Sequence, residues 1–239
     1  MKFDYLMIGG GKLATHLEHY FKHLKLDFIQ VDPRAYDQAE KLALQSKTVL
    51  LAISDCAIEA YYNQHLKKYE LDVVHFSGAL SIKGMQSCHP LMCFTEDLYT
   101  LEKYLQIPFI CEKGKKSFSE IFPKLSNPHF EIDPEKKALY HALCVMGGNF
   151  TTLLWQEVIE NVEKKLGLAK EILFPYLEQT IINLKKDHKK ALTGPLARED
   201  QKTISKNIDS LEQNHLQQTY QNFVHLYKQR RENENSRLH

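Results

Sequence analysis

The sequence lacks both an excess of charge of one sign and a long apolar run. It has 31 Lys and Arg residues against 30 Asp and Glu residues, a formal net charge of +1, which argues against nucleic acid as a partner. No apolar run approaches the roughly 18 residues that a membrane-spanning helix needs, and no signal-peptide pattern precedes the first apolar segment. We therefore expect a cytoplasmic protein with no membrane partner.

Cysteine is scarce, with five residues, and no two of them form a CxxC pair. An odd number of cysteines among mostly apolar neighbours favours reduced thiols and argues against a disulfide framework. Cys88, His89 and Cys93 are potential metal ligands, but a fourth ligand at zinc-like spacing is missing. We therefore expect no metal site.

Repeats and low-complexity segments are also missing, apart from a polar C-terminal run that has little to bury. This run predicts a disordered tail over residues 231–239. Hydrophobic residues make up 43% and charged residues 26% of the 239 residues, as in a folded globular protein. The length allows one large domain or two modest ones.

Short apolar runs alternate with helical stretches in the first half of the chain. Runs of this kind are typical of a parallel sheet that is covered on both faces, so residues 1–130 predict a doubly wound, Rossmann-like α/β domain that binds a dinucleotide. The expected strands cover residues 3–8, 27–31, 48–53, 73–76 and 107–111.

Residues 131–230 predict an all-helical C-terminal domain, because no convincing strand follows the prolines at 128 and 134. Asp133 and Pro134 favour the start of a long helix that ends before Gly167. The stretch 168–187 predicts a second helix, with a kink or break at Pro175. Asp200 is expected to cap a third helix, through about residue 211, and a fourth helix is expected over 215–230.

A glycine-rich turn follows the first expected strand. Its pattern is G-x-G-x-x-A, in which Gly9 permits the turn, Gly11 lets the backbone approach a pyrophosphate and Ala14 allows close helix packing. Together with Lys12 and Leu13, these residues open the next helix, whose unpaired N–H groups favour an anion. We expect this turn to bind NADP or NAD; the alternative is a glycine turn that binds nothing.

The end of the second expected strand carries two conflicting cofactor signals. Asp32 suits a ribose 2′-hydroxyl, whereas Arg34 suits a 2′-phosphate. We expect Asp32 to turn away from such a phosphate to avoid repulsion, and NADP to be slightly preferred. Ser54 ends the next strand and is expected to touch the cofactor. Asp55 is expected to cap the helix that follows.

Two further segments provide candidates at the crevice. Ser77 and Gly78 end a strand, where a small residue lets a nicotinamide or a substrate come close, although a plain turn is the alternative. His89 precedes a proline and is expected to point from a loop as a substrate ligand; a structural histidine is the alternative.

The long helix contains Gly147 and Gly148, and each glycine costs about 1 kcal/mol relative to alanine in a helix. We expect close approach of a ligand or a second helix there, with His141 and Asn149 roughly on the same face. Tight packing alone is the alternative. Further on, Arg198 follows a Gly-Pro turn and is a candidate for binding an anionic substrate group, or for an ion pair that only holds the turn.

Five segments carry a family resemblance: IGGGKLATHL, VVHFSGALS, CHPLMCF, ALYHALCVMGGNF and ALTGPLARED. In this order they resemble Rossmann-like NADP oxidoreductases with a C-terminal domain of unknown function. That family is similar in build to the 6-phosphogluconate dehydrogenase, ketopantoate reductase and pyrroline-5-carboxylate reductase group. The resemblance covers nearly the whole chain, and implies an active crevice between the two domains and a homodimer formed through the helices.

The better-known relatives often place a catalytic lysine and asparagine on the long helix, whereas here no lysine lies between His141 and Asn149. We expect an oxidoreductase that transfers hydride between a nicotinamide and a small carbonyl, hydroxyl or imine substrate. His141 would donate or accept the proton, and Asn149 and Ser77 would orient the reacting oxygen. The alternative is a dinucleotide-binding sensor or scaffold without turnover, which the absence of that lysine favours slightly.

Overall fold

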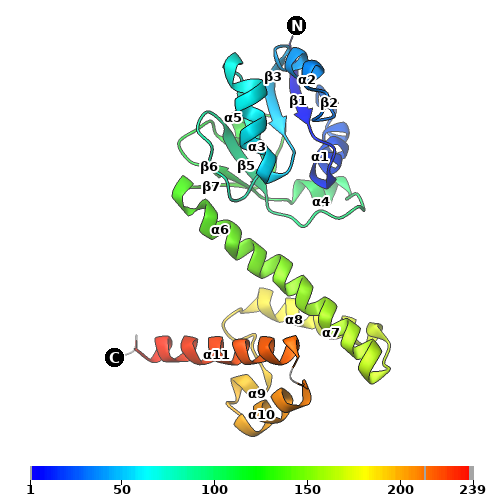
Figure 1. Cartoon of the computed structure of the whole chain (residues 1–239), viewed down its shortest axis with the longest axis vertical. Coiled ribbons are helices and arrows are strands. Elements are labelled where there is room, and N and C mark those ends of the chain that lie inside the picture. The colour runs from blue at the N-terminus through cyan, green and yellow to red at the C-terminus, as the bar shows by residue number, and fades with distance from the viewer. Residues whose placement is uncertain (1, 213, 237–239) are drawn as a thin grey trace. The chain divides into compact units, whose positions relative to one another are not determined.

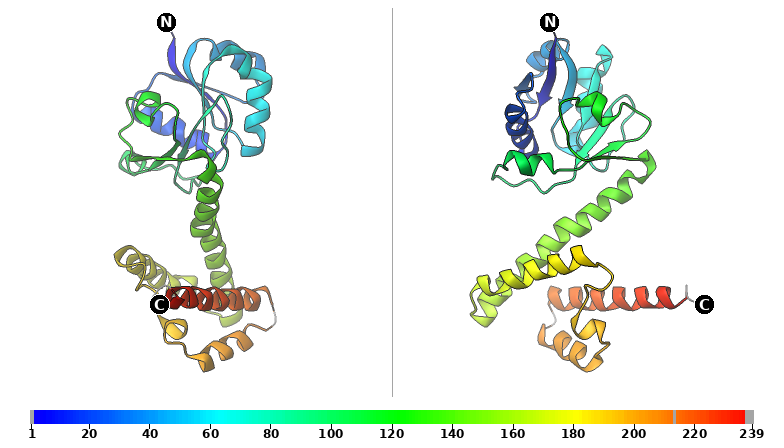
Figure 2. Two further views of the ribbon diagram at one scale, coloured as in Figure 1. Left: turned by 90° about the vertical axis from the view of Figure 1, so that its left-hand side faces the viewer. Right: turned by 180° about the vertical axis from the view of Figure 1, so that it is seen from behind.

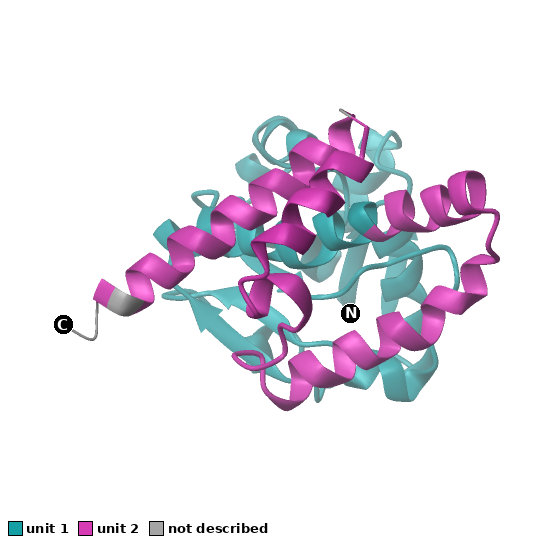
Figure 3. Cartoon of the chain, turned by 90° about the horizontal axis from the view of Figure 1, so that it is seen from below, with its two compact units in different colours: residues 1–154 teal, residues 155–239 magenta. Residues whose placement is uncertain are grey.

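The computed structural model describes residues 2–212 and 214–236. The chain forms two compact units, residues 1–154 and 155–239, and the division falls inside helix α7 (Thr151–Leu166) (Figure 3). The expected division, between residues 130 and 131, lies before the long helix. The units divide later because the first turns of this helix pack against the sheet of unit 1, where they bury Lys137.

Unit 1 contains a seven-stranded sheet in the order β2-β1-β3-β4-β5-β6-β7 (Figure 1). Neighbouring strands are parallel, except that β6 runs antiparallel to β5. The predicted α/β class with a mostly parallel sheet is therefore confirmed. The strands are β1 (Phe3–Ile8), β2 (Phe28–Val31), β3 (Ser46–Leu51), β4 (Asp72–His75), β5 (Gln86–Pro90), β6 (Phe109–Glu112) and β7 (His129–Ile132).

Helices cover both faces of this sheet, so successive side chains of β1 enter two different cores (Figure 2). Tyr5 and Met7 pack with helices α1, α4 and α5, whereas Leu6 and Ile8 pack with α2 and α3. This arrangement explains why the first half of the sequence shows continuous apolar runs. The helices are α1 (Lys12–His23), α2 (Tyr36–Ala43), α3 (Asp55–Tyr61), α4 (Leu101–Leu105) and α5 (Phe118–Ile121).

Two strands were not expected from the sequence. Strand β5 includes His89, which the sequence places in a loop, and strand β7 lies between Pro128 and Pro134, where no strand is predicted. Both strands are short and have few apolar residues, so their sequences alone do not indicate a strand. They become strands by pairing with β6.

A disulfide joins Cys88 of β5 to Cys111 of β6. The two residues are direct partners in the antiparallel pair, with their Cα atoms 4.2 Å apart, and both are buried. The expectation of reduced thiols is wrong for this pair, because a sequence separation of 23 residues gives no sign of the strand register. The bridge also removes Cys88 from the potential metal ligands.

The long helix contains a π-helical segment. Helix α6 (Lys137–Cys144) continues through π-helical residues 145–150 into α7, and the two glycines lie within that segment. The Cβ of an alanine at position 148 would lie 3.6 Å from Cys93 Sγ, whereas at position 147 it would meet nothing within 4 Å. Gly148 therefore makes only an ordinary contact with a loop residue and Gly147 makes none, so close approach of a ligand or a second helix at these glycines stays a prediction.

Unit 2 is helical, as expected. Pro175 lies in the first turn of α8, after a 3₁₀ turn over residues 170–173, and Asp200 caps α10 by accepting a hydrogen bond from the Thr203 amide. Besides the end of α7, the helices are α8 (Phe174–Lys186), α9 (Gly194–Ala197), α10 (Gln201–Ser210) and α11 (His215–Ser236).

The tail expected from residue 231 is helical through residue 236, so that prediction is wrong for these residues. An ion pair of 3.1 Å joins Arg231 to Glu199, and a second one joins Arg230 to Glu234 one turn later. These ion pairs stabilise the end of the helix, and they cannot be predicted from the polar composition of the segment. Residues 237–239 of the predicted tail lie outside the described residues. In the part of the chain that the structure describes, no helix combines the length and apolarity needed to cross a membrane.

Candidate functional site

A cleft of about 700 Å³ opens at the carboxyl ends of β1, β2 and β3. The strand order reverses direction between β1 and β3, and open α/β sheets bind ligands at such a point. The glycine turn, the residues after β2 and the residues after β3 all line this cleft. Its lining includes the predicted cofactor residues Gly11, Lys12, Leu13, Asp32, Arg34 and Ser54.

The turn has the geometry that a pyrophosphate needs. Gly9 has a φ of +153°, and a Cβ there would overlap the carbonyl oxygen of Ala52, so only glycine lets the turn lie this close to β3. A Cβ at Gly10 or Gly11 would meet no atom within 4 Å, so these two residues present bare backbone to open space. Ala14 is fully buried beneath the first turn of α1.

Helix α1 begins without a side-chain cap at Gly11, which leaves the N–H groups of its first turn available. Such groups, together with the helix dipole, stabilise a bound anion. The residues present at this turn therefore fit the phosphates of a dinucleotide.

Asp32 and Arg34 bind each other at the far side of the cleft. Arg34 Nη2 lies 2.8 Å from Asp32 Oδ2, and its Nε and backbone N–H both donate to Oδ1. That Asp32 turns away from a 2′-phosphate stays a prediction. These hydrogen bonds lower the pKa of Asp32 to about 2. Tyr36 and Tyr61 line the same cleft, and the sequence analysis did not single them out.

The residues after β3 differ in part from expectation. Ser54 lines the cleft and immediately precedes α3. Asp55 is the first residue of that helix rather than its cap, and its carboxylate accepts a hydrogen bond from the Ser77 hydroxyl. Ser77 Oγ also accepts from the amides of Ala79 and Leu80, so this hydroxyl is fully engaged in shaping the turn.

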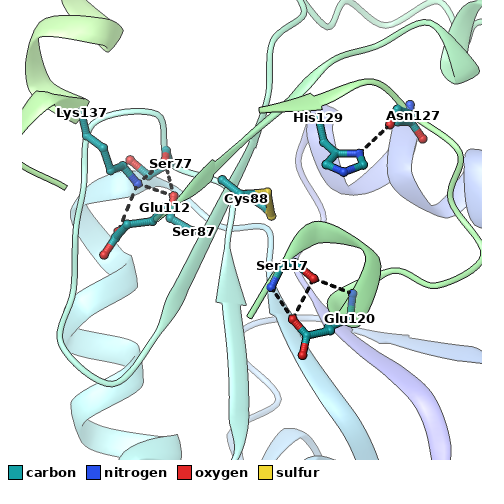
Figure 4. Close-up of a disulfide and its surroundings, with 10 residues drawn as sticks. Ser77, Ser87, Cys88, Glu112, Ser117, Glu120, Asn127, His129 and Lys137 are labelled. Carbon is teal, nitrogen blue, oxygen red and sulfur yellow. Dashed lines mark hydrogen bonds and ion pairs between the residues drawn. A yellow bond between two sulfur atoms is a disulfide. The ribbon is translucent and has the colours of Figure 1, made fainter. Parts of the chain in front are cut away.

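A second group of polar residues lies at the ends of β4, β5 and β6, and its centre is Lys137 (Figure 4). The side chain is only 3% exposed; its ammonium donates to the Ser87 hydroxyl and to the Ser77 carbonyl, and lies 3.7 Å from Glu112 Oε2. Burial lowers the pKa of Lys137 to about 8, although Glu112 opposes the shift. This ammonium is therefore poised to release a proton near neutral pH.

Lys137 was not predicted as a site residue, because the lysine of the better-known relatives was expected between His141 and Asn149. Lys137 instead precedes His141 by four residues, which places both side chains on one face of α6. The spacing of four residues could have indicated that Lys137 shares a site with His141.

Two imidazoles converge on Gly78, at the end of β4. Built onto Gly78, a Cβ would lie 2.6 Å from His141 Nδ1 and 3.2 Å from the ring of His89. Nδ1 of His141 is buried without a hydrogen-bond partner, while His89 Nδ1 is 2.8 Å from the Tyr140 hydroxyl. Burial lowers the pKa of His89 to about 4, so this imidazole is neutral at neutral pH.

The structure thus brings together three of the predicted site residues, Ser77, His89 and His141. Asn149 is exposed, in the π-helical segment two turns beyond His141. Arg198 belongs to unit 2, where it is exposed at the end of α9.

Residues 109–226 match the family model described as Domain of unknown function (DUF2520). None of the curated proteins matches the sequence significantly. The match agrees with the resemblance to proteins that carry a C-terminal domain of unknown function, and the similar solved structures show the same fold.

Solved structures cover both units. A "putative NADP oxidoreductase" from Bacteroides fragilis is 22% identical, with 95% of this chain and 98% of that chain covered and a TM-score of 0.76. Protein TM1727 from Thermotoga maritima is 26% identical, with 97% and 99% covered and a TM-score of 0.71. Pyrroline carboxylate reductase from Plasmodium falciparum, with NADP bound, is 17% identical, with 96% and 98% covered and a TM-score of 0.55.

We predict that Gly78→Ala disrupts the histidine pair. The new Cβ would overlap His141 Nδ1, so the imidazoles must move and the free energy of unfolding should fall by about 1–3 kcal/mol. Urea denaturation measures the loss, and NMR signals of the imidazole protons report the displacement. The control is Gly147→Ala, whose Cβ meets open space. Unchanged stability and unchanged histidine signals in Gly78→Ala would contradict this geometry.

Proposed function

We propose that the protein is an NAD(P)-dependent oxidoreductase that transfers hydride between a nicotinamide and a small carbonyl, hydroxyl or imine substrate. The observation that carries this proposal is that one sheet holds both a phosphate-binding turn after β1 and a buried ammonium that donates to the Ser77 carbonyl after β4, where two imidazoles meet at Gly78. The first suits a dinucleotide and the second suits proton transfer.

A bound nicotinamide supplies the hydride chemistry, and the chain supplies binding and the proton. Lys137 is charged at neutral pH and able to give up its proton, because its pKa is about 8. His141 offers a ring nitrogen with no protein partner. We assign the proton donor or acceptor to these two residues, while Ser77 and Ser87 hold the ammonium in place.

The substrate class is supported by the names of similar proteins. The P. falciparum relative is a pyrroline carboxylate reductase, and a pyrroline is a cyclic imine. This favours an imine among the three proposed substrate types. The contacts of Ser77, His89, Asn149 and Arg198 with substrate, and the cytoplasmic location, stay predictions.

The alternative, a sensor without turnover, loses the observation that favoured it. That observation was the absence of a lysine between His141 and Asn149, and Lys137 supplies a buried lysine one turn before His141.

Turnover tests the function directly. Purified protein is incubated with NADH or NADPH and a panel of keto acids, hydroxy acids and cyclic imines, and the absorbance of the reduced cofactor is followed. Lys137→Met and His141→Ala should each lower kcat by about 100-fold, as expected for loss of an acid–base group, with little change in cofactor affinity. Lys136→Met is the control, since Lys136 is exposed and pairs with Asp133. Full activity in both site variants would refute the assigned roles.

Cofactor binding is tested at the turn. Gly11→Val places a branched side chain where the pyrophosphate would lie, so the affinity for NADH and NADPH should fall more than tenfold, about 1.4 kcal/mol or more. Calorimetric titration measures both affinities. If the parent binds neither cofactor, or the variant binds as tightly as the parent, the assignment of the turn is wrong.

We also propose that NADP is preferred over NAD through Arg34. Its guanidinium already makes a forked contact with Asp32 at the cleft, and the same fork fits a 2′-phosphate. Arg34→Ala should weaken NADPH binding by about tenfold and leave NADH binding nearly unchanged. Asp32→Asn is the companion variant, which frees Arg34 and should strengthen NADPH binding. The same NADPH-to-NADH ratio in the parent and in Arg34→Ala would exclude contact with the phosphate.

We propose that the chain forms a homodimer through its helices. Five large apolar side chains lie on the long helix at alternating spacings of four and three residues, and each is between 53% and 63% exposed. We call these five side chains the apolar stripe; exposed apolar groups of this kind are typical of a surface that a partner covers. They are Leu139, Leu143, Met146, Phe150 and Leu153.

Sedimentation velocity tests the dimer. Leu143→Glu places a charge in the stripe and should convert a dimer into a monomer, because a buried unpaired carboxylate is costly. The matched control is Leu44→Glu, at an exposed leucine next to α2 and outside the stripe. A parent that sediments as a monomer, or a Leu143→Glu variant that remains a dimer, would contradict the proposal.

A further inference from the structure

Glu112 is a buried carboxylate that contacts the proposed site through Lys137. It ends β6, and its side chain is only 2% exposed. One carboxylate oxygen, Oε1, accepts from the Ser81 hydroxyl at 2.9 Å and pairs with Lys115 Nζ at 2.7 Å. The other oxygen, Oε2, lies 3.7 Å from Lys137 Nζ and accepts no hydrogen bond. One buried carboxylate therefore serves two ammonium groups.

The two lysines differ in their surroundings. Lys137 is buried, and its ammonium contacts Ser87, Ser77 and Glu112. Lys115 is 25% exposed, and its ammonium also donates to the carbonyl oxygens of Met85 and Ile82. Lys115 is therefore solvated and hydrogen-bonded even without Glu112, whereas Lys137 depends on Glu112 as its nearest counter-charge.

We propose that Glu112 is a positioning residue that keeps the Lys137 ammonium charged and in place, and that Lys115 limits this effect by sharing the same carboxylate. The inference rests on the proposed function for its catalytic consequence, since Glu112 acts only through Lys137. The carboxylate and the second cation together set how readily Lys137 gives up its proton.

The charges around Lys137 support this division of roles. Burial is the largest cause of its lowered pKa, Glu112 and Asp55 oppose the shift, and Lys115 adds to it. From the strands, His75 of β4 and His89 of β5 also face this region. Burial, and in second place neighbouring positive groups, lowers their pKa values to about 3 and about 4, so both are neutral near pH 8.

His141 lies one turn along α6 from Lys137, and Tyr140 precedes it. Burial raises the pKa of Tyr140, so its hydroxyl is neutral in the same pH range. Glu112, Lys115 and Asp55 are therefore the charged groups that we expect to control Lys137.

Two substitutions should move the Lys137 pKa in opposite directions. Glu112→Gln removes the counter-charge and keeps the shape, so the pKa should fall by about one unit or more, a tenfold rise in the proton dissociation constant. Lys115→Met removes the competing cation, so the pKa should rise, by about half a unit or more. A role limited to packing would not give shifts of opposite sign.

The measurement is an NMR titration of protein labelled with ¹³C at lysine Cε, with Lys137→Arg used to assign the Lys137 signal. Asp72→Asn is the matched control, because it removes an exposed carboxylate from Lys116, next to Lys115, and should leave Lys137 unchanged. If Glu112→Gln does not fold, Lys115→Met carries the test alone, since that side chain is partly exposed. Unchanged titration of Lys137 in the folded variants, or shifts of the same sign, would overturn the proposal.

The pH dependence of kcat then separates this inference from the proposed function. With turnover, the basic limb of the profile should move to lower pH in Glu112→Gln and to higher pH in Lys115→Met. An unmoved limb despite the NMR shifts would overturn the effect of Glu112 on turnover through Lys137. NMR shifts without turnover on any substrate would refute the proposed function and leave the control of Lys137 by Glu112 intact, whereas turnover with an unshifted Lys137 would refute only this inference.

Discussion

A buried ammonium holds the candidate site together. Removing a charge from water is costly, and the cost is offset only when the charge finds a counter-charge and hydrogen-bond acceptors in the interior. Lys137 finds them on three strands, through Ser77 after β4, Ser87 on β5 and Glu112 on β6. This single side chain therefore ties the start of the long helix to the sheet, and His141 reaches Gly78 because the helix begins there.

Much of the fold could be predicted because local sequence reflects burial. The run Tyr5–Ile8 is continuously apolar because its side chains enter two cores, and the turn from Gly9 has few possible structures between a strand and a helix. Strand β5 escaped prediction for the opposite reason. Its residues Gln86–Pro90 look like a loop, and only pairing with β4 and β6, which is set far away in the sequence, makes them a strand.

The glycine turn of the candidate site could be predicted from the sequence, whereas the buried charges around the long helix could not. Gly11 and Ser54 line the cleft as expected, because carboxyl ends of parallel strands meet at one edge of a sheet. Lys137 and Glu112 were missed, since a charged residue at a helix start or strand end is usually solvated and its sequence neighbours do not reveal its burial. Long-range pairs of this kind depend on the register of strands, which composition and spacing do not encode.

The Cys88–Cys111 bridge acts on that register. Side chains alternate between the faces of a strand, so a slip of β6 by one residue against β5 would send Glu112 to the opposite face and take the nearest counter-charge away from the Lys137 ammonium. Ser87 and Glu112 are the immediate chain neighbours of the two bridged cysteines. The covalent bond therefore fixes the register of two short strands. It does so next to Ser87 and Glu112, where a shift of one residue would separate the buried Lys137 ammonium from Glu112.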